Sequence, residues 1–223
     1  MKKSRFISLF LSITLIFSLL VSSAGALDSE IVNSMSVEAK AAILVDMDTD
    51  YVMYELNAHE KAYPASITKV MTAALVLDAV QAGTLSMDQI ITAGDTAWQG
   101  LDSSSSNQNI QVGEQMSVED LLYCLMVASA NEAANILAVE VAGSIENFVG
   151  MMNAKAAALG CTGTNFVNPH GLSEEGQLST AADMALIAEE ALDNETVREI
   201  SGTVEHTIPA TNVSGERELN NFN

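Results

Sequence analysis

Residues 64–73 read Pro-Ala-Ser-Ile-Thr-Lys-Val-Met-Thr-Ala, the start of an apolar, alanine-rich run. The pattern predicts a helix from Ser66 to about Gln81, with Ala82-Gly83 as its stop signal. Ser66 then lies on the first turn, where free backbone N–H groups and the helix dipole favour a developing anion. Lys69 follows three residues later and lies on the same face. Because a lysine whose pKa is lowered by burial can take the proton of a serine hydroxyl, the pair predicts a nucleophile and its base.

A second candidate group lies at Ser129-Ala130-Asn131, directly after an almost wholly apolar helix predicted from Val118 to about Ala128. Ser117 is the predicted cap of that helix. A hydroxyl and an amide two residues apart, at a break between helices, can pass a proton to a leaving amine and hold a substrate carbonyl. The same spacing in Ser105-Ser106-Asn107 falls in a polar loop, and we assign it to chance.

The remaining pattern predicts a β-hairpin, several further helices and few strands. The hairpin joins two short β-prone runs, residues 41–46 and 51–55, through a polar turn. Two further strands are expected, a short one within 85–92 and another over 204–210. Three further helices are expected: one over 132–141, one that starts after the Ser144 cap and ends at 159, and one over 181–192 after a Ser179 or Thr180 cap. No closing element is expected after that strand.

The N-terminus has the pattern of a secretory leader. A short basic segment precedes an apolar run from Phe6 to Val21, and small residues in an Ala-x-Ala pattern follow. We predict a signal peptide over residues 1–26, with cleavage after Ala26 and export of the mature chain; an uncleaved N-terminal anchor is the alternative. The formal charge of −20 over 223 residues indicates a surface that repels nucleic acid and anionic lipid.

The cysteines and histidines do not predict a metal site. Cys124 lies in an apolar run and is interpreted as a buried thiol, although export would permit a disulfide with Cys161. The three histidines are scattered and make no ligand pattern with the cysteines. We therefore expect neither a metal nor a cofactor.

Taken together, these segments resemble the serine D-alanyl-D-alanine carboxypeptidases of the peptidase S11 family, the low-molecular-mass penicillin-binding proteins. The resemblance rests on Pro-Ala-Ser66-Ile-Thr-Lys69, on Ser129-Ala-Asn131, and on segments 166–172 and 179–185, and it covers residues 40–223. It implies an α/β (α+β) fold of the β-lactamase/transpeptidase type, in which a helical cluster packs on an antiparallel sheet that is incomplete in this chain. Residues 27–223 would then be the catalytic domain, lacking its C-terminal part.

The family's chemistry is removal of the terminal D-alanine from peptidoglycan pentapeptides through an acyl-enzyme. Carried over to this chain, Ser66 is the nucleophile, Lys69 its base, Ser129 the proton relay and Asn131 the residue that positions substrate. The backbone N–H of Ser66 would form half of an oxyanion hole. The resemblance also implies peptidoglycan stem peptides as substrates, β-lactams as covalent inhibitors, and a place at the cell wall or the outer face of the cytoplasmic membrane. For His170 and Asp183, in matching segments, we expect structural roles.

The family's third motif, Lys-Thr-Gly on a sheet strand, does not occur in the sequence, and no lysine follows Lys155. We therefore expect that the chain stops just before this motif, that residues 27–223 alone are poorly stable and nearly inactive, and that a C-terminal membrane anchor would lie beyond residue 223. Two alternatives stay open. One is a class A β-lactamase, whose Glu-x-x-Leu-Asn pattern is mimicked by residues 216–220; the other is a non-catalytic cell-wall binding protein that lost the third motif.

Overall fold

The computed structural model describes residues 37–221, and contacts divide the chain into two units after Ala58. The predicted leader, residues 1–26, lies outside the described residues. The first unit contains the antiparallel hairpin of β1 (Ala42–Asp46) and β2 (Tyr51–Leu56), with Ala42 opposite Leu56. The Asp46 side chain accepts hydrogen bonds from the backbone N–H groups of residues 48 and 49, which fixes the turn. The predicted hairpin is confirmed.

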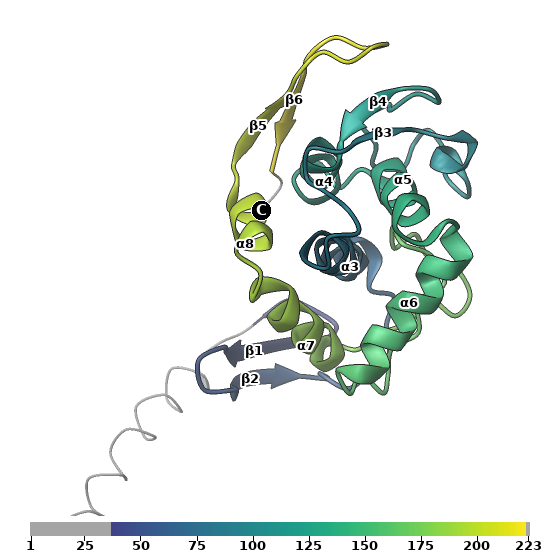
Figure 1. Ribbon diagram of the computed structural model, residues 1–223. Coiled ribbons are helices and arrows are strands. Elements are labelled where there is room, and N and C mark those ends of the chain that lie inside the picture. Colours follow the sequence, from purple (N-terminus) through teal and green to yellow (C-terminus); the bar gives the residue numbers. More distant parts are fainter. Residues whose placement is uncertain (1–36, 222–223) are drawn as a thin grey trace, which may run out of the picture. The chain divides into compact units, whose positions relative to one another are not determined.

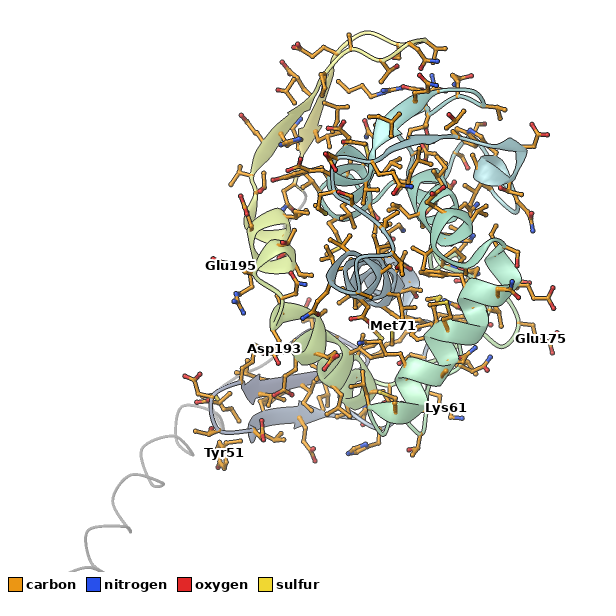
Figure 2. The ribbon with its side chains drawn as sticks, viewed as in Figure 1. Tyr51, Lys61, Met71, Glu175, Asp193 and Glu195 are labelled. Atoms are coloured by element: carbon orange, nitrogen blue, oxygen red, sulfur yellow. The ribbon has the colours of Figure 1, made fainter. Side chains whose placement is uncertain are left out.

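The second unit is a helical cluster built around α3 (Thr68–Gln81). Four helices contact α3, as Figure 1 shows: α4 (Val118–Met126), α5 (Asn131–Ala142), α6 (Ile145–Ala158) and α7 (Ala181–Leu192). Since α3 is surrounded, side chains around most of its circumference are buried, among them Met71, which points into the interior (Figure 2). A helix that is apolar on all sides is suited to this central place.

The helix starts follow the predicted capping residues. The hydroxyl groups of Ser117, Ser144 and Thr180 each accept a hydrogen bond from the backbone N–H three residues later, at 3.0–3.1 Å. One start differs from the prediction, because Ser66 belongs to a separate 3-10 turn, η1 (Ala65–Ile67), and α3 begins only at Thr68. Ala65, the first residue of this turn, has a left-handed backbone with φ of 51°.

Short elements of low apolar content were not predicted. They are η2 (Asp95–Trp98), β4 (Gln115–Ser117), α8 (Glu195–Gly202) and β6 (Arg217–Asn220). The expectation that no element follows the last predicted strand is wrong, because β6 pairs antiparallel with β5 (Glu205–Ile208). Similarly, β4 pairs with β3 (Ile90–Thr92), the strand predicted within 85–92. The polar residues of β6 hide a strand whose Leu219 is buried against the helices.

The core of the second unit includes both cysteines. Cys124 on α4 and Cys161 after α6 are buried free thiols, so the interpretation of Cys124 as a buried thiol is confirmed. Burial raises the pKa of the Cys124 thiol to about 12, and the protonated form is therefore maintained. Over residues 37–221, none of the helices combines the length and apolar character needed to span a bilayer.

Candidate active site

Ser66 and Lys69 meet at the N-terminal end of α3. The Lys69 ammonium group donates a hydrogen bond to Ser66 Oγ, with Nζ and Oγ 3.3 Å apart. Ser66 itself is exposed, whereas only 3% of Lys69 is accessible to solvent. An exposed hydroxyl beside a buried amine is the arrangement that the sequence predicted for a nucleophile and its base.

The Lys69 side chain is held by a second, shorter hydrogen bond. Its Nζ donates to the backbone carbonyl of His170 at 2.7 Å. Burial lowers the pKa of Lys69 from 10.5 to about 8, although the negative charge of Glu132 opposes this shift. Lys69 therefore loses its proton only a little above neutral pH, as a general base requires.

The carbonyl of His170 is fixed by a tight turn over residues 168–172. The Asn168 amide closes this turn from both ends, since Oδ1 accepts from the N–H of Gly171 and Nδ2 donates to the carbonyl of Leu172. Thr72 on α3 donates to the carbonyl of Pro169 at 2.6 Å. The turn is thus bonded to the same helix that carries Lys69.

Gly171 makes the closest approach between this turn and the segment before Ser66. Its φ is 90°, and a Cβ at this position would lie 1.9 Å from the carbonyl oxygen of Ala65. Only glycine fits such a conformation and such a contact. A structural role was expected for His170, but the hydrogen bond between its carbonyl and Lys69 was not predicted from the sequence.

Asp183 has the structural role that was expected. Its Oδ2 atom accepts hydrogen bonds from the N–H of Gly163 and the hydroxyl of Thr164, at 2.8 and 2.7 Å. These bonds join the start of α7 to the segment after α6.

The side chain of His170 is buried, and burial, followed by the charge of Lys69, lowers its pKa to about 4.

Ser129 lies at the sharp break between α4 and α5. Its backbone is left-handed, with φ of 54°, and its Oγ is buried without a hydrogen-bond partner in the part of the chain that the structure describes. The break is held by two bonds: the N–H of Ala130 donates to the carbonyl of Cys124, and the N–H of Asn131 donates to the carbonyl of Ser106. A strained residue with an unused hydroxyl is typical of a functional position.

A cleft of about 510 Å³ brings three of the four predicted residues together. Ser66, Lys69 and Ser129 line it, together with Ser106, Asn221 and a mainly apolar wall. Asn131 is 2% exposed and is not among the lining residues, so its expected contact with substrate stays a prediction. Glu216 of the β-lactamase-like pattern is exposed before β6 and does not line the cleft.

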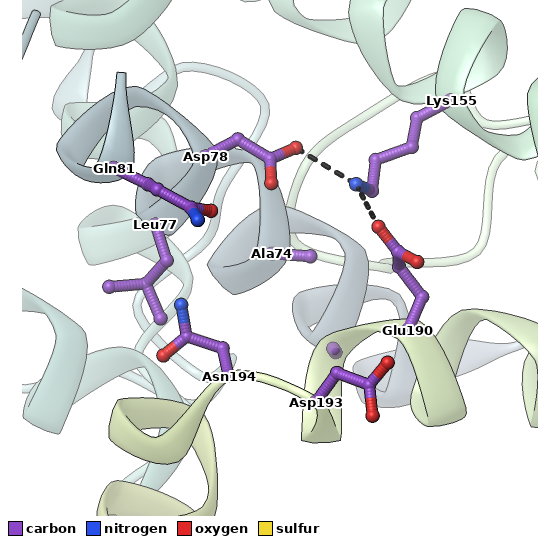
Figure 3. Close-up of a pocket in the computed structure, with 9 residues that line it drawn as sticks. Ala74, Leu77, Asp78, Gln81, Lys155, Glu190, Asp193 and Asn194 are labelled. Carbon is purple, nitrogen blue, oxygen red and sulfur yellow. Dashed lines mark hydrogen bonds and ion pairs between the residues drawn. The ribbon is translucent and has the colours of Figure 1, made fainter. Parts of the chain in front are cut away.

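A second cavity, of about 250 Å³, lies between α3, α6 and the end of α7 (Figure 3). Lys155 reaches across it and forms ion pairs with Asp78 at 2.9 Å and Glu190 at 2.7 Å. Its lining contains neither a serine nor a cysteine, and its one cation is already paired. The serine–lysine cleft is therefore the candidate active site.

The fold and the site define a class of protein in which a helical cluster carries an exposed serine, in a 3-10 turn, hydrogen-bonded to a buried lysine on the first turn of the following helix. The chain belongs to the peptidase S11 family, described as D-alanyl-D-alanine carboxypeptidase, whose sequence profile matches residues 28–222. The family resemblance stated from the motifs is thereby confirmed.

Named relatives agree with this assignment. The chain is 39% identical over 179 residues to the D-alanyl-D-alanine carboxypeptidase DacF of Bacillus subtilis, covering 80% of this chain and 45% of that protein. It is 43% identical over 159 residues to DacC of Escherichia coli, covering 70% and 40% respectively. The chain therefore spans less than half the length of these two relatives.

A solved structure confirms the fold class. Penicillin-binding protein 5 of Haemophilus influenzae superposes with a TM-score of 0.77 at 31% identity, covering 84% of this chain and 53% of that one. The predicted combination of helices with antiparallel strands of the penicillin-binding type is thus correct. In residues 37–221 the strands form three separate two-stranded sheets.

Proposed function

We propose that this protein acts as a serine-type D-alanyl-D-alanine carboxypeptidase on peptidoglycan stem peptides. One observation carries the proposal: Ser66 Oγ is hydrogen-bonded to a buried lysine whose pKa is lowered to about 8, in a cleft of a peptidase S11 chain. The likeness to relatives named for this activity supports the same substrate class.

In the proposed reaction, neutral Lys69 takes the proton of Ser66 as Oγ attacks the carbonyl of the terminal peptide bond. The Ser66 N–H stabilises the oxyanion of the tetrahedral intermediate. Ser129 passes a proton to the leaving nitrogen, the C–N bond breaks, and D-alanine departs. Water then attacks the Ser66 ester, which releases the shortened peptide and returns the proton to the serine. Asn131 positions the substrate.

We also propose that the protein acts outside the cytoplasm, at the cell wall or the outer face of the cytoplasmic membrane, and that β-lactams acylate Ser66. The leader pattern of residues 1–26 supports export, and residues 27–223 then belong to the exported catalytic domain. The structural likeness to a penicillin-binding protein supports acylation by β-lactams.

The test is to isolate the protein from its own cells, treat it with penicillin, and measure the intact mass and the modified peptide. We expect a stable penicilloyl adduct on Ser66, an N-terminus at Leu27, and release of D-alanine from a peptide ending in D-Ala-D-Ala. Rapid turnover of penicillin would instead indicate a β-lactamase. No adduct and no released D-alanine would indicate a non-catalytic binding protein.

A further inference from the structure

The loop between η2 and β4, two residues beyond the cleft-lining Ser106, is held at residue 108 from two sides. The N–H of Gln108 donates to Glu132 Oε1 at 2.6 Å, and the carbonyl of the same residue accepts from Arg217 Nε at 3.0 Å. The N–H of Ile110 donates to the same Glu132 oxygen at 3.3 Å. A carboxylate on α5 and a guanidinium on β6, 85 positions later in the sequence, therefore fix one short loop segment.

This segment is continuous with the candidate active site. Ser106 lines the cleft beside Ser129, and its carbonyl accepts the N–H of Asn131 at 3.0 Å. Glu132 follows Asn131 directly in the chain. Consequently the carboxylate that binds residues 108 and 110 lies on the first turn of α5, which begins at Asn131 directly after Ser129-Ala130.

Charged and titratable groups surround Glu132 on several elements. Lys69 lies on α3, Arg217 on β6 and Cys124 on α4, and Arg217 is also paired with the buried carboxylate of Glu114 at 2.7 Å. Glu132 is fully buried, and its Oε2 has no hydrogen-bond partner among residues 37–221. Burial raises the pKa of Glu132, while its backbone hydrogen bonds and Arg217 favour the charged form.

The charge of Glu132 also acts on the base. Burial lowers the pKa of Lys69, and the negative charge of Glu132 raises it. The backbone carbonyl of His170 accepts a hydrogen bond from Lys69. The pKa of the His170 side chain is itself lowered, by burial and by the charge of Lys69. The charge of Glu132 thus partly offsets the effect of burial on the pKa of Lys69.

We propose that Glu132 is a positioning residue of the Ser66–Lys69–Ser129 site: it holds residues 106–110 against α5 and places a buried carboxylate at the side of the site that carries Lys69. Arg217 holds the same loop segment from the β5–β6 hairpin. The proposal deepens the proposed function and rests on it, since it assigns a second role to a residue that the sequence indicated only as a helix start.

Three variants of the native full-length gene product test the proposal. Glu132→Gln keeps an oxygen that accepts both N–H groups but removes the charge, whereas Glu132→Ala removes both. Glu190→Gln is the matched control, because it makes the same chemical change at a half-exposed carboxylate in the Lys155 cavity. The rate of Ser66 acylation by a fluorescent penicillin is measured from pH 6 to 10, together with hydrogen exchange of residues 106–110.

For Glu132→Gln we expect the rising limb of the acylation rate to move toward acid by about half a pH unit or more, because an opposing charge is removed from Lys69. Hydrogen exchange of the loop segment should stay at the wild-type rate. Glu132→Ala should move the limb and also speed exchange at Gln108 and Ile110 by tenfold or more, and Glu190→Gln should change neither.

The outcomes separate the two proposals. If the wild-type protein gives no penicilloyl adduct, the proposed function fails, and the exchange rates of Glu132→Ala still decide whether Glu132 holds the loop. If the wild-type protein is acylated but Glu132→Gln keeps the wild-type pH limb, the tuning of Lys69 is refuted. Wild-type exchange in Glu132→Ala refutes the positioning of the loop.

Discussion

Replacement of Gly171 by alanine tests how the turn at residues 168–172 supports the candidate site. A Cβ at this position would lie 1.9 Å from the carbonyl oxygen and 2.5 Å from the carbonyl carbon of Ala65, next to the proposed nucleophile. Because such contacts normally exceed 3 Å, the turn or the Ala65–Ser66 segment has to move by about 1 Å. The substitution should therefore lower the free energy of unfolding and also displace Ser66 relative to Lys69.

The expected magnitude has two parts. The positive φ costs an alanine about 1–2 kcal/mol, and the backbone displacement adds about 2–3 kcal/mol, as in overpacked cores. Gly176→Ala is the matched control, because its φ is 92° but the nearest side-chain atom to its Cβ is 3.4 Å away. We expect a loss of about 1–2 kcal/mol for Gly176→Ala and about 3–5 kcal/mol for Gly171→Ala.

The assays are urea unfolding of both variants and the rate of Ser66 acylation by penicillin. A displacement of about 1 Å at the His170 carbonyl should slow acylation by about 100-fold in Gly171→Ala, with little change in Gly176→Ala. If the two variants lose equal stability and both acylate Ser66 at the wild-type rate, the supporting role of this turn is refuted.

Three further predictions follow from individual contacts. The rate of acylation should rise with pH through about 8 as Lys69 loses its proton. In Lys69→Arg, whose side chain stays protonated, this rise should be absent and the rate should be lower by at least about 100-fold. A pH-dependent rise that persists in the variant contradicts the assignment of Lys69 as the base. The pKa of His170 is lowered from 6.5 to about 4 in the folded protein, so the unfolded chain takes up this proton first as the pH falls. Stability should therefore decrease by about 2–3 kcal/mol between pH 6.5 and 4. In urea unfolding at pH 7 and 4.5, His170→Asn should lack this component of the decrease. Asn135→Ala removes two hydrogen bonds to the carbonyls of Ala97 and Gln99 and should cost about 2–3 kcal/mol, whereas Asn147→Ala, at an exposed helix start, should cost under about 1 kcal/mol; equal losses would show that burial of these carbonyls is unimportant.

Much of the helical cluster could be predicted because its sequence signals are local. Ser117, Ser144 and Thr180 cap their helices with hydroxyl groups three residues from the N–H that they bind, and such a signal is visible in a short stretch. The strand β6 could not be predicted in this way, because its stability comes from pairing with β5 and from burial of one side chain, Leu219.

The same distinction applies to the site. Ser66 and Lys69 lie one helical turn apart, so their contact follows from spacing. The bonds of Lys69 to the His170 carbonyl and of Gln108 to Glu132 join residues 101 and 24 positions apart. No periodicity connects such distant positions, although Gly171 in an Asn-Pro-His-Gly turn is a signal of a close backbone contact.

Substitutions of Lys155 and of its two carboxylate partners, Asp78 and Glu190, should differ in how well the fold tolerates them. Its ammonium group has two carboxylates within ion-pair distance, one on α3 and one on α7. Loss of either acid leaves one complete pair, so a substitution at residue 78 or 190 alone is buffered by the other. Loss of the lysine instead leaves two carboxylates facing one cavity without a cation. Among diverging descendants of this chain, position 155 should therefore change only together with neutralisation of at least one acid.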